Sequence, residues 1–500
     1  MNLNTVGRRL AALLMGLLMG LLMGGGGGGG WIAMRPAQAG SPWQVGVDPT
    51  YPPFEMQAAD TGELTGLDVE LMREIGRRSG HPIQFVALPF SGLIPALQSR
   101  NLDAAASAMT ITAERARTVD FSRPYFAAGL AIAVRDGSPD LASLAALKGR
   151  RVAVQIGSTG AKAVAAVPGV AVVQFDAAPL ALQELINGNV EAYVNDLPAT
   201  LYAIREARLA GVRIAGKPLT ADFYGIALPK GSPLLAEING ALGAMLADGS
   251  YEAIYRRWFD QPPPQLPMVA PALADSGSAA QLNLGRLGQN LLRGAGITLA
   301  LTLLSFCFGL VGACLLAFSL MGGIRPVRWA SRLYIAFFRG TPMLVQLFLI
   351  YFGLPALCRD LGVPFSLDRF VAAVLAMSLN VAAYMAETLR GGIESIEASQ
   401  WDAADALAMN PIERMRFVIF PQALQRVLPP LANECITLIK DTSLAAVIGF
   451  DELFREGQLM VATTYRAFEI YIAVAIVYLV MTSTAAALFQ GLERRLRPPA

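Results

Sequence analysis

The sequence predicts an α/β domain followed by an all-α membrane domain of about five transmembrane helices. Short β-rich runs alternate with helical patterns from Trp43 to about Gln261, which is typical of α/β folds. After about residue 290 the chain is dominated by apolar blocks of the length that a membrane helix requires. We expect the α/β domain at residues 40–262, a linker at 263–284 and the membrane domain at 285–500.

The N-terminus has the parts of a secretory signal peptide. Arg8 and Arg9 precede the apolar run "LAALLMGLLMGLLM", and the small residues of "AQA" at Ala37–Ala39 follow it. Basic residues, an apolar segment and a small-residue exit in this order direct a chain to export. We expect a signal peptide over residues 1–39, or an uncleaved anchor, with the α/β domain outside the cytoplasm.

The α/β domain is predicted from two kinds of segment. Its strands are the β-rich runs "WQVGVD", "IQFVAL", "RVAVQIG", "VAVVQF", "EAYVND" and "FYGIALP". Its helices have apolar residues at helical spacing, as in "LDVELMREIGRRSG", "GLIPALQSRN" and "PLALQELINGN". We expect mainly parallel sheets with a ligand at the carboxyl ends of the strands. The proline-, alanine- and serine-rich "DQPPPQLPMVAPALADSGSAAQ" has the composition of a linker.

The membrane domain is predicted from five apolar blocks. They lie near Ile297–Met321, Leu333–Leu354, Phe370–Leu389, Leu428–Phe450 and Ile470–Phe489. Five crossings place the two ends of this domain on opposite sides of the membrane. The segments rich in basic residues then face the cytoplasm, in agreement with the positive-inside rule. They are the loop with Arg325, Arg328 and Arg332, the stretch with Arg414 and Arg416, and the tail "LERRLRPPA".

Composition excludes several classes of partner and site. With 40 Lys and Arg against 38 Asp and Glu, the net charge of +2 gives no support for a nucleic-acid partner. All four cysteines fall in the apolar half, so the α/β domain cannot rely on a disulfide. We expect no cofactor and no metal site, and we expect His81, the only histidine, to be structural.

Several stretches of the α/β domain resemble the amino-acid-binding members of family 3 of the periplasmic solute-binding proteins. These are "VDPTYPPFE", "GLDVELMREI", "FSGLIPALQSRNLDAAASAMTITAERARTVDFS", "QIGSTGAKA" and "YEAIYRRWF". The resemblance implies the type II periplasmic-binding-protein fold, with two α/β lobes joined by crossover strands near Ala127–Arg135 and Asp222–Leu228. A ligand is trapped when such lobes close.

A zwitterionic ligand in a dry cleft needs a partner for each charge, because an unpaired buried charge is costly. Arg115 offers a planar fork for a carboxylate, Thr110 and the backbone of Gly157–Thr159 offer further donors, and Asp196 can accept from an ammonium. The resemblance implies the same roles for Thr110, Arg115, Ser158 and Thr159 at the carboxylate, and for Asp196 at the amino group.

The remaining cleft residues are implied by the resemblance. Tyr51 and Phe90 match positions that sandwich the ligand side chain, Asp48 and Gln155 match positions that contact its polar end, and Ser107 completes the set. The alternatives are a core role for the two aromatic residues and a strand-end cap for Asp48. Glutamine-binding relatives often have lysine at the position of Gln155, so glutamine specificity does not follow. Without an evident cation there, we expect a polar or basic L-amino acid, either glutamine or one of arginine, lysine and histidine.

The apolar half resembles the permease of polar amino acid ABC transporters. The matching stretches are "FFRGTPMLVQLFLIYFGLP", "SLNVAAYMAETLRGGIESI", "EASQWDAADALAMNPIERMRFVIFPQAL" and "VIFPQALQRVLPPLANECITLIKDTSL". The resemblance implies a homodimer of the permease, a separate ATP-binding subunit that hydrolyses ATP, and a cytoplasmic coupling helix near 397–411. The chain itself is then not an enzyme, and we expect it in the bacterial inner membrane.

The predicted coupling helix has the composition that docking to another subunit requires. "SQWDAADALAM" has good helix propensity, and the small residues Ala403, Ala404 and Ala408 let a partner approach closely. Asp402 replaces the usual glutamate of the family. Ala408 stands where glycine is usual, so we expect a different turn after the helix. An amphipathic helix on the inner leaflet is the alternative, but the stretch is too rich in alanine and acid for that role.

Ionisable residues inside membrane helices are costly and tend to be paired or functional. Six polar residues lie in or near the predicted helices: Arg339, Asn380, Glu387, Glu434, Lys440 and Asp441. Glu387 and Glu434 are candidates for an intramembrane substrate path, and pairing with Arg390 or Lys440 is the alternative.

Together these features predict the substrate-binding and permease subunit of an ATP-driven importer of polar or basic L-amino acids. The alternative is an amino-acid-gated ion channel or receptor that uses the same binding fold. In such channels the membrane helices interrupt the binding domain, whereas here they begin after "YEAIYRRWF" has completed it. No pore-filter motif such as "TVGYG" occurs in the sequence.

Overall fold

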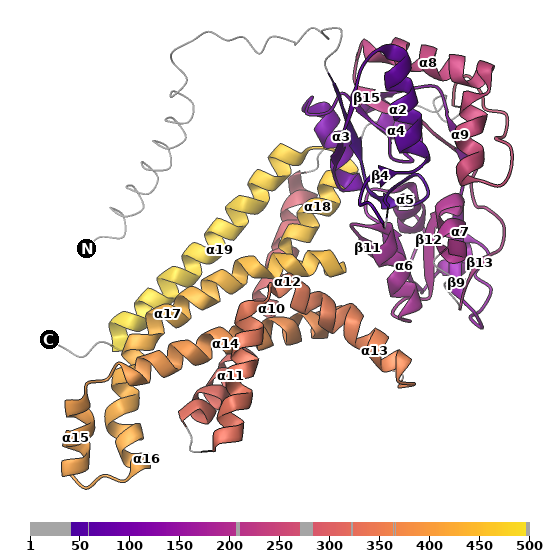
Figure 1. Cartoon of the computed structure of the whole chain (residues 1–500). Coiled ribbons are helices and arrows are strands. Elements are labelled where there is room, and N and C mark those ends of the chain that lie inside the picture. Colours follow the sequence, from indigo (N-terminus) through magenta and orange to yellow (C-terminus); the bar gives the residue numbers. More distant parts are fainter. Residues whose placement is uncertain are drawn as a thin grey trace, which may run out of the picture. The chain divides into compact units, whose positions relative to one another are not determined.

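The computed structural model describes residues 42–58, 60–206, 211–270, 284–321, 324–363, 365 and 367–496 (Figure 1). The predicted signal peptide and residues 271–283 of the predicted linker lie outside the described residues. The described chain from Pro42 onward belongs to one compact unit.

The first lobe, called the N-lobe below, is built on a five-stranded sheet. Its strands, in spatial order, are β5 (Ile83–Ala87), β1 (Trp43–Val47), β6 (Ala104–Ala105), β15 (Ala227–Pro229) and β7 (Val119–Phe121). Its helices are α2 (Leu67–Ser79), α3 (Phe90–Gln98), α4 (Ala113–Thr118), α8 (Leu234–Asp248) and α9 (Ser250–Trp258). A small sheet is formed by β2 (Thr50–Tyr51), β3 (Glu55–Gln57) and β4 (Leu64–Thr65). His81 stacks on Trp43, with ring centroids 4.8 Å apart.

The second lobe, the C-lobe, repeats this plan. Its strands, in spatial order, are β11 (Ala171–Phe175), β10 (Arg151–Gln155), β12 (Ala192–Asp196), β9 (Leu130–Arg135) and β13 (Val212–Ala215). Its helices are α5 (Thr159–Ala165), α6 (Ala178–Ile186), α7 (Leu197–Glu206) and the 3₁₀ turn η1 (Leu144–Leu147). Every strand predicted from the sequence is present, and the two-lobed α/β fold is confirmed.

The crossover strands explain why the sheets are only partly parallel. β1 pairs with β5 and β6 in parallel, as β10 does with β11 and β12, whereas β9 and β15 run antiparallel to their neighbours. These two strands follow the chain's passages between lobes, and they enter each sheet from the opposite end. Between the lobes, β8 (Phe126–Ala128) pairs antiparallel with β14 (Asp222–Tyr224), at the predicted crossovers.

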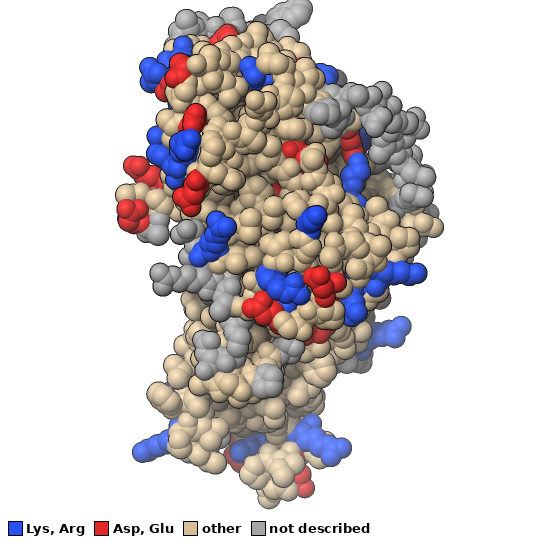
Figure 2. Space-filling model, turned by 90° about the vertical axis from the view of Figure 1, so that its right-hand side faces the viewer, with Lys and Arg blue, Asp and Glu red and all other residues tan. Residues whose placement is uncertain are grey.

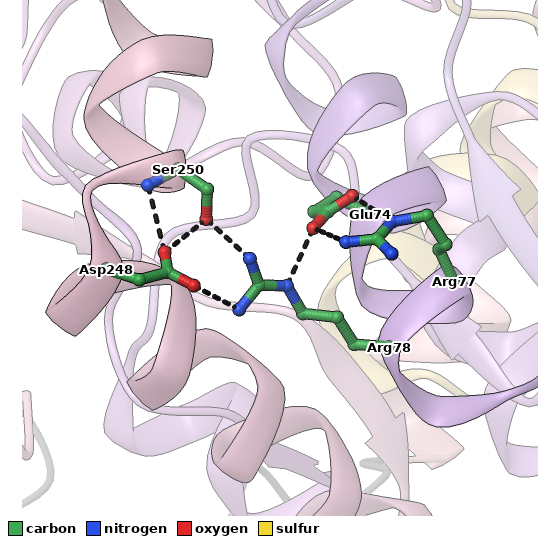
Figure 3. Close-up of polar contacts among 5 residues, drawn as sticks. All are labelled: Glu74, Arg77, Arg78, Asp248 and Ser250. Atoms are coloured by element: carbon green, nitrogen blue, oxygen red, sulfur yellow. Dashed lines mark hydrogen bonds and ion pairs between the residues drawn. The ribbon is translucent and has the colours of Figure 1, made fainter.

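An ion-pair network joins the helices on the outer face of the N-lobe (Figure 3). Arg78 donates to Glu74 on its own helix, to Asp248 at the end of α8 and to Ser250 at the start of α9. Arg77 also donates to Glu74. Asp248 accepts from the backbone and hydroxyl of Ser250, so one carboxylate both begins α9 and connects it to α2.

The second half of the chain is helical. Its elements are α10 (Leu284–Met321), α11 (Arg325–Gly340), α12 (Met343–Phe348), the π-turn η3 (Leu349–Gly353), α13 (Leu354–Asp360), α14 (Arg369–Glu394), α15 (Ala398–Ala406), α16 (Pro411–Glu413), the π-turn η4 (Arg414–Ile419), α17 (Phe420–Asp441), the 3₁₀ turn η5 (Thr442–Ile448), α18 (Leu453–Thr464) and α19 (Ala467–Leu496). By length and composition, three described helices are able to cross a membrane, or four if the bent pair α11–α12 is one span.

The second predicted span, Leu333–Leu354, is broken rather than continuous. The helix bends by 109° between Gly340 and Met343. Pro342 lacks a backbone donor and disrupts the helix at this point. The side-chain amide of Gln346 donates to the carbonyl oxygens of Phe338 and Thr341, and Asn380 donates to Phe338 and to Gln346. Polar side chains therefore satisfy the backbone groups that the break exposes.

Two further expectations for this half need correction. The fourth block, Leu428–Phe450, is helical only as far as Asp441, and its helix α17 begins earlier, at Phe420. Two internal prolines and several charged residues keep α17 outside the helices that qualify as spans, so five continuous crossings are not found among the described residues. Arg325 begins helix α11, so the predicted basic loop is a helical turn.

The surface of the helical half is apolar. On the face shown in Figure 2, the lower part is mostly free of charged side chains, which gather at its lowest edge. Large exposed apolar residues are spread along the long helices: Leu303, Phe308, Val311, Leu315 and Phe318 on α10, and Ile476, Val480 and Leu488 on α19. Exposed apolar surface on this scale fits contact with lipid.

Candidate functional site

All ten residues predicted to bind substrate line one cavity between the two lobes. Asp48, Tyr51, Phe90, Ser107, Thr110 and Arg115 come from the N-lobe, and Gln155, Ser158, Thr159 and Asp196 come from the C-lobe. Ala108 is an additional lining residue that the sequence did not indicate. The cavity lies where strand ends meet helix N-termini, as predicted for this type of sheet.

The two lobes are closed on each other in this structure. Gln155 Nε2 of the C-lobe donates to Asp48 Oδ2 of the N-lobe at 3.0 Å. Arg115 Nη2 donates to the carbonyl oxygen of Gly157 at 3.0 Å. The hydroxyl of Tyr51 lies 3.0 Å from Asp196 Oδ2. Three polar contacts therefore join the lobes around the cavity.

Arg115 is held rigidly at the cavity wall. Helix α4 begins at Thr112, whose hydroxyl oxygen caps the helix by accepting from the Arg115 backbone N–H. The Arg115 guanidinium donates to the carbonyl oxygen of Thr110 at 2.8 Å and lies 5.2 Å from the centroid of the Phe90 ring. A buried guanidinium on neutral acceptors still lacks a counter-charge, so the site favours an anion.

Asp196 provides the opposite charge. Its Oδ2 accepts from the hydroxyls of Tyr224 at 2.6 Å and Tyr51 at 3.0 Å. Its Oδ1 is buried and has no hydrogen-bond partner among the described residues. Burial raises the pKa of Asp196 to about 6, while the two tyrosine hydroxyls act in the opposite direction. An unpartnered carboxylate oxygen at the cavity is suited to a cationic donor.

The amide of Gln155 has a fixed orientation. Its Nε2 lies between two acceptors, Asp48 Oδ2 at 3.0 Å and the carbonyl oxygen of Asp176 at 3.2 Å. Both neighbours require a donor, so the NH₂ group faces them and the amide oxygen is the atom left for a ligand. Asp48 itself accepts from Thr50 and from the Phe90 backbone, so both of its oxygens are occupied.

A buried pair of carboxyl groups supports the cavity floor, and sequence reasoning missed it. Ser107 Oγ donates to Glu55 at 2.6 Å, and the backbone N–H of Ala108 donates to Asp68 at 2.7 Å. Ala108 has a φ of 43°, a left-handed conformation that this bond helps to hold. Burial raises the pKa of Asp68 to about 7. The available signal was an acidic residue at a buried position of an otherwise apolar helix face.

The predicted coupling helix is present as α15, which lies with α16 at one end of α14 and α17 (Figure 1). Asp402 and Ala403 are exposed, but Ala404 is buried within the chain, so it is not available to a partner. The expectation for Ala404 is therefore wrong, because this face of α15 packs on η4. Arg414 of η4 pairs with Asp405 and lies over the Trp401 ring, which fixes α15 in place.

The turn after α15 keeps the left-handed backbone that glycine would favour. Ala408 has a φ of 52°, so the expected change of turn is not found. A left-handed alanine costs about 1–2 kcal/mol, which the next segment offsets in part. Asn410 and Glu413 form a capping box at the start of α16.

Two exposed apolar residues beside this turn were not predicted. Leu407 is 71% exposed and Ile412 is 78% exposed, on either side of Ala408. Large apolar side chains in an acidic, alanine-rich surface segment were the signal that sequence reasoning passed over.

The two intramembrane candidates differ in their surroundings. Glu387 forms an ion pair with Arg390 at 2.6 Å, and Arg390 also pairs with Glu394. This favours the structural alternative for Glu387. Glu434 has no ion pair within the described residues, so the two glutamates do not form one site.

Two protein-family profiles match the chain. The family described as bacterial extracellular solute-binding proteins, family 3, matches residues 43–261. The family described as binding-protein-dependent transport system inner membrane component matches residues 309–498. The first range corresponds to the two lobes and the second to the helical half.

Curated relatives and solved structures agree with this division. The glutamine transport system permease protein GlnP of Escherichia coli strain K12 is 42% identical over 207 residues, which are 41% of this chain and 93% of the relative. The arginine transport system permease protein ArtQ of Bacillus subtilis strain 168 is 37% identical over 207 residues, 41% of this chain and 92% of the relative. The solved structure of an ancestral arginine-binding protein bound to arginine is 43% identical and covers 44% of this chain and 98% of its own, with a TM-score of 0.43.

Proposed function

This chain belongs to the amino-acid ABC transporter permeases of the inner membrane, with a family 3 solute-binding domain on the same polypeptide, and from that premise we propose that it imports a polar or basic L-amino acid. Glutamine, arginine, lysine and histidine are the candidate substrates. Residues 40–262 are the binding domain outside the cytoplasm, 263–284 the linker and 285–500 the permease.

The observation that carries this proposal is the pairing of opposite charges across one cavity. Arg115, with Thr110 and the N-terminal residues of α5, binds the α-carboxylate of the substrate, and Asp196 Oδ1 accepts from its α-ammonium. Neither charge then remains unpaired in the closed cleft, which offsets the cost of removing both from water.

The opposite end of the cavity selects the side chain. The Gln155 amide oxygen accepts a hydrogen bond, so a guanidinium, an ammonium, an imidazole N–H or a carboxamide suits it. An acidic side chain would meet this oxygen and Asp48 without a cation to offset the repulsion. The relatives named for glutamine and arginine transport agree with this range.

ATP hydrolysis belongs to a separate subunit in this proposal. The segment 397–411 docks on that subunit through Asp402, Ala403 and the turn at Ala408, with Leu407 and Ile412 as apolar anchors. Two copies of the chain form the pathway, so that each of two ATPases meets one coupling segment. Tethering the binding domain to its permease makes delivery intramolecular, with an effective concentration on the order of millimolar.

A screen of the full-length chain in nanodiscs against the twenty L-amino acids tests the substrate class. Calorimetry should show tight binding of at least one of glutamine, arginine, lysine and histidine, and no binding of aspartate or glutamate. Uptake of the same amino acid should follow in liposomes supplied with the cognate ATPase and ATP. Preferred binding of an acidic amino acid, or no binding of any amino acid, would contradict the proposal.

Affinity should depend on pH through Asp196. Its carboxyl group has a pKa of about 6 in the closed, empty cleft, and an ammonium ion beside it lowers that pKa because it stabilises the charged form. Below pH 6 binding must therefore displace a proton. We expect constant affinity above pH 7 and a loss of up to about tenfold per pH unit below pH 6.

Calorimetry in two buffers with different ionisation enthalpies measures this proton release directly. The substitution Asp196→Asn should remove the pH dependence and lower the affinity at pH 7.5. An affinity that stays constant from pH 8 to pH 5 would show that Asp196 does not pair with the ammonium.

A further inference from the structure

Helix α18 of the permease contacts both lobes of the binding domain. Its first turn lies against the C-lobe, through Arg455. Its other end packs against α3 of the N-lobe. The two lobes move relative to each other when a cleft of this type opens, so one rigid helix fits both of them only in the closed arrangement.

The C-lobe contact is polar and completely buried. Arg455 is fully buried, donates to Asp176 Oδ1 at 2.7 Å, and also donates to the carbonyl oxygen of Gln174. A second permease segment contacts the same lobe, because the Tyr351 hydroxyl donates to the buried carboxylate of Glu184. Buried, charge-assisted bonds of this kind hold a specific geometry.

The N-lobe contact is apolar and smaller. Tyr465 follows α18 with a φ of 59°, a left-handed conformation that is unfavourable for an aromatic residue. Its side chain packs on the N-lobe core that includes Leu93, Ile94 and Leu97 of α3. The strained turn therefore directs one aromatic ring onto the lobe that has no other polar hold on α18 among the described residues.

Helix α18 is fixed to the membrane helices at its N-terminus. Glu452 caps it by accepting from the backbone N–H groups of Phe454 and Arg455. The same carboxylate accepts from the hydroxyls of Tyr478 on α19 and Thr298 on α10. Both of those helices are candidate membrane spans. A change at α18 is therefore passed directly to the permease.

Both contacts lie next to the residues that line the cleft. The carbonyl oxygen of Asp176 accepts from Gln155, while the Asp176 side chain pairs with Arg455. Gly157, whose carbonyl oxygen accepts from Arg115, lies against Ala462 of α18, at 3.6 Å from an added Cβ. Phe90 lines the cleft and begins α3. The position of each lobe at the ligand is thus linked to α18 by one or two residues.

We propose that α18 recognises the closed, loaded binding domain: the C-lobe stays bound through Arg455, and the N-lobe closes onto Tyr465 when ligand binds. The proposal rests on the proposed function, because it takes an amino acid to be the ligand that closes the lobes. By thermodynamic reciprocity, a contact made only in the closed state also raises the affinity for that ligand.

Hydrogen–deuterium exchange on the full-length chain in nanodiscs tests this, with glutamine and arginine as the two probes. At least one probe should slow amide exchange in residues 151–165 of the cleft and, at the same time, in α3 and in 461–467 at the end of α18. In the variant Tyr465→Gly, which removes the ring and suits the left-handed backbone, slowing should persist in the cleft and disappear from 461–467. Calorimetry should show affinity about tenfold weaker.

Asp176→Asn weakens the C-lobe contact from the other side without changing α18, and we expect the same loss of protection and affinity. Asp248→Asn is the matched control, since it removes a carboxylate paired with an arginine at the same distance, 2.7 Å, on the outer face of the N-lobe. It should behave as the parent protein (Figure 3).

The outcomes separate the two levels of the argument. Slower exchange in the cleft without any change at 461–467 would overturn the role of α18 and leave the proposed function standing. Parental affinity and parental protection in Tyr465→Gly would overturn it as well. If neither amino acid affects the cleft, both the proposed function and this inference fail.

Discussion

The substitution Arg115→Ala should leave the chain folded and lower its affinity for the amino acid by roughly a hundredfold to several thousandfold. The buried guanidinium is the cation that faces the substrate carboxylate, and removing one partner of a buried ion pair costs about 3–5 kcal/mol. Part of the loss reflects the closed cleft itself, because Arg115 also donates across the lobes to Gly157. Calorimetry on the full-length chain measures the change.

Two further variants separate charge from geometry. Arg115→Lys keeps the charge but loses the planar fork, so its affinity should lie between those of the parent and Arg115→Ala. Arg77→Ala is the control, since it removes an arginine of the same lobe whose side chain is 69% exposed and outside the cavity. If Arg115→Ala bound the amino acid as tightly as Arg77→Ala, Arg115 would not be a ligand contact.

The cleft could be predicted almost completely from the sequence, and the reason is local. Its residues follow strand ends or begin helices, and strand order then brings them to one edge of each sheet. Gln155 ends β10, Asp196 ends β12 and Phe90 begins α3. Such positions are visible as the borders of periodic segments. The sequence could not show which side-chain atoms are already satisfied, such as both oxygens of Asp48.

The residues that sequence reasoning missed depend on contacts between distant segments. Asp68 lies in an ordinary amphipathic helix, and only the fold places it under Ala108. Arg455 lies in a short helix, and its partner Asp176 is far away in the sequence. The break at Pro342 was visible, but hydropathy over the whole block concealed it, because both arms of the bend are apolar. Burial of Ala404 likewise depends on the packing of η4 against α15.

A double variant of the coupling segment, Leu407→Asp with Ile412→Asp, should abolish uptake while amino-acid binding remains at the parental level. Both side chains are more than two-thirds exposed at the turn between α15 and α16. Exposed apolar side chains of this size mark a surface that another protein covers. Central apolar anchors of an interface each contribute about 2 kcal/mol or more, so two charges there should weaken docking of the ATPase about a thousandfold.

The measurement is substrate-stimulated ATP hydrolysis and uptake in liposomes that contain the chain and its cognate ATPase. We expect both to fall to the level without substrate, with calorimetry confirming intact binding in the cleft. Met268→Asp is the control, because it adds a charge at an equally exposed apolar side chain, 69% exposed, that lies outside the coupling segment. Since the cleft and the coupling segment are separate in the chain, loss of one activity with retention of the other is the result that assigns them different roles. Parental uptake in the double variant would instead mean that the ATPase docks elsewhere and that α15 and its turn do not transmit its motion.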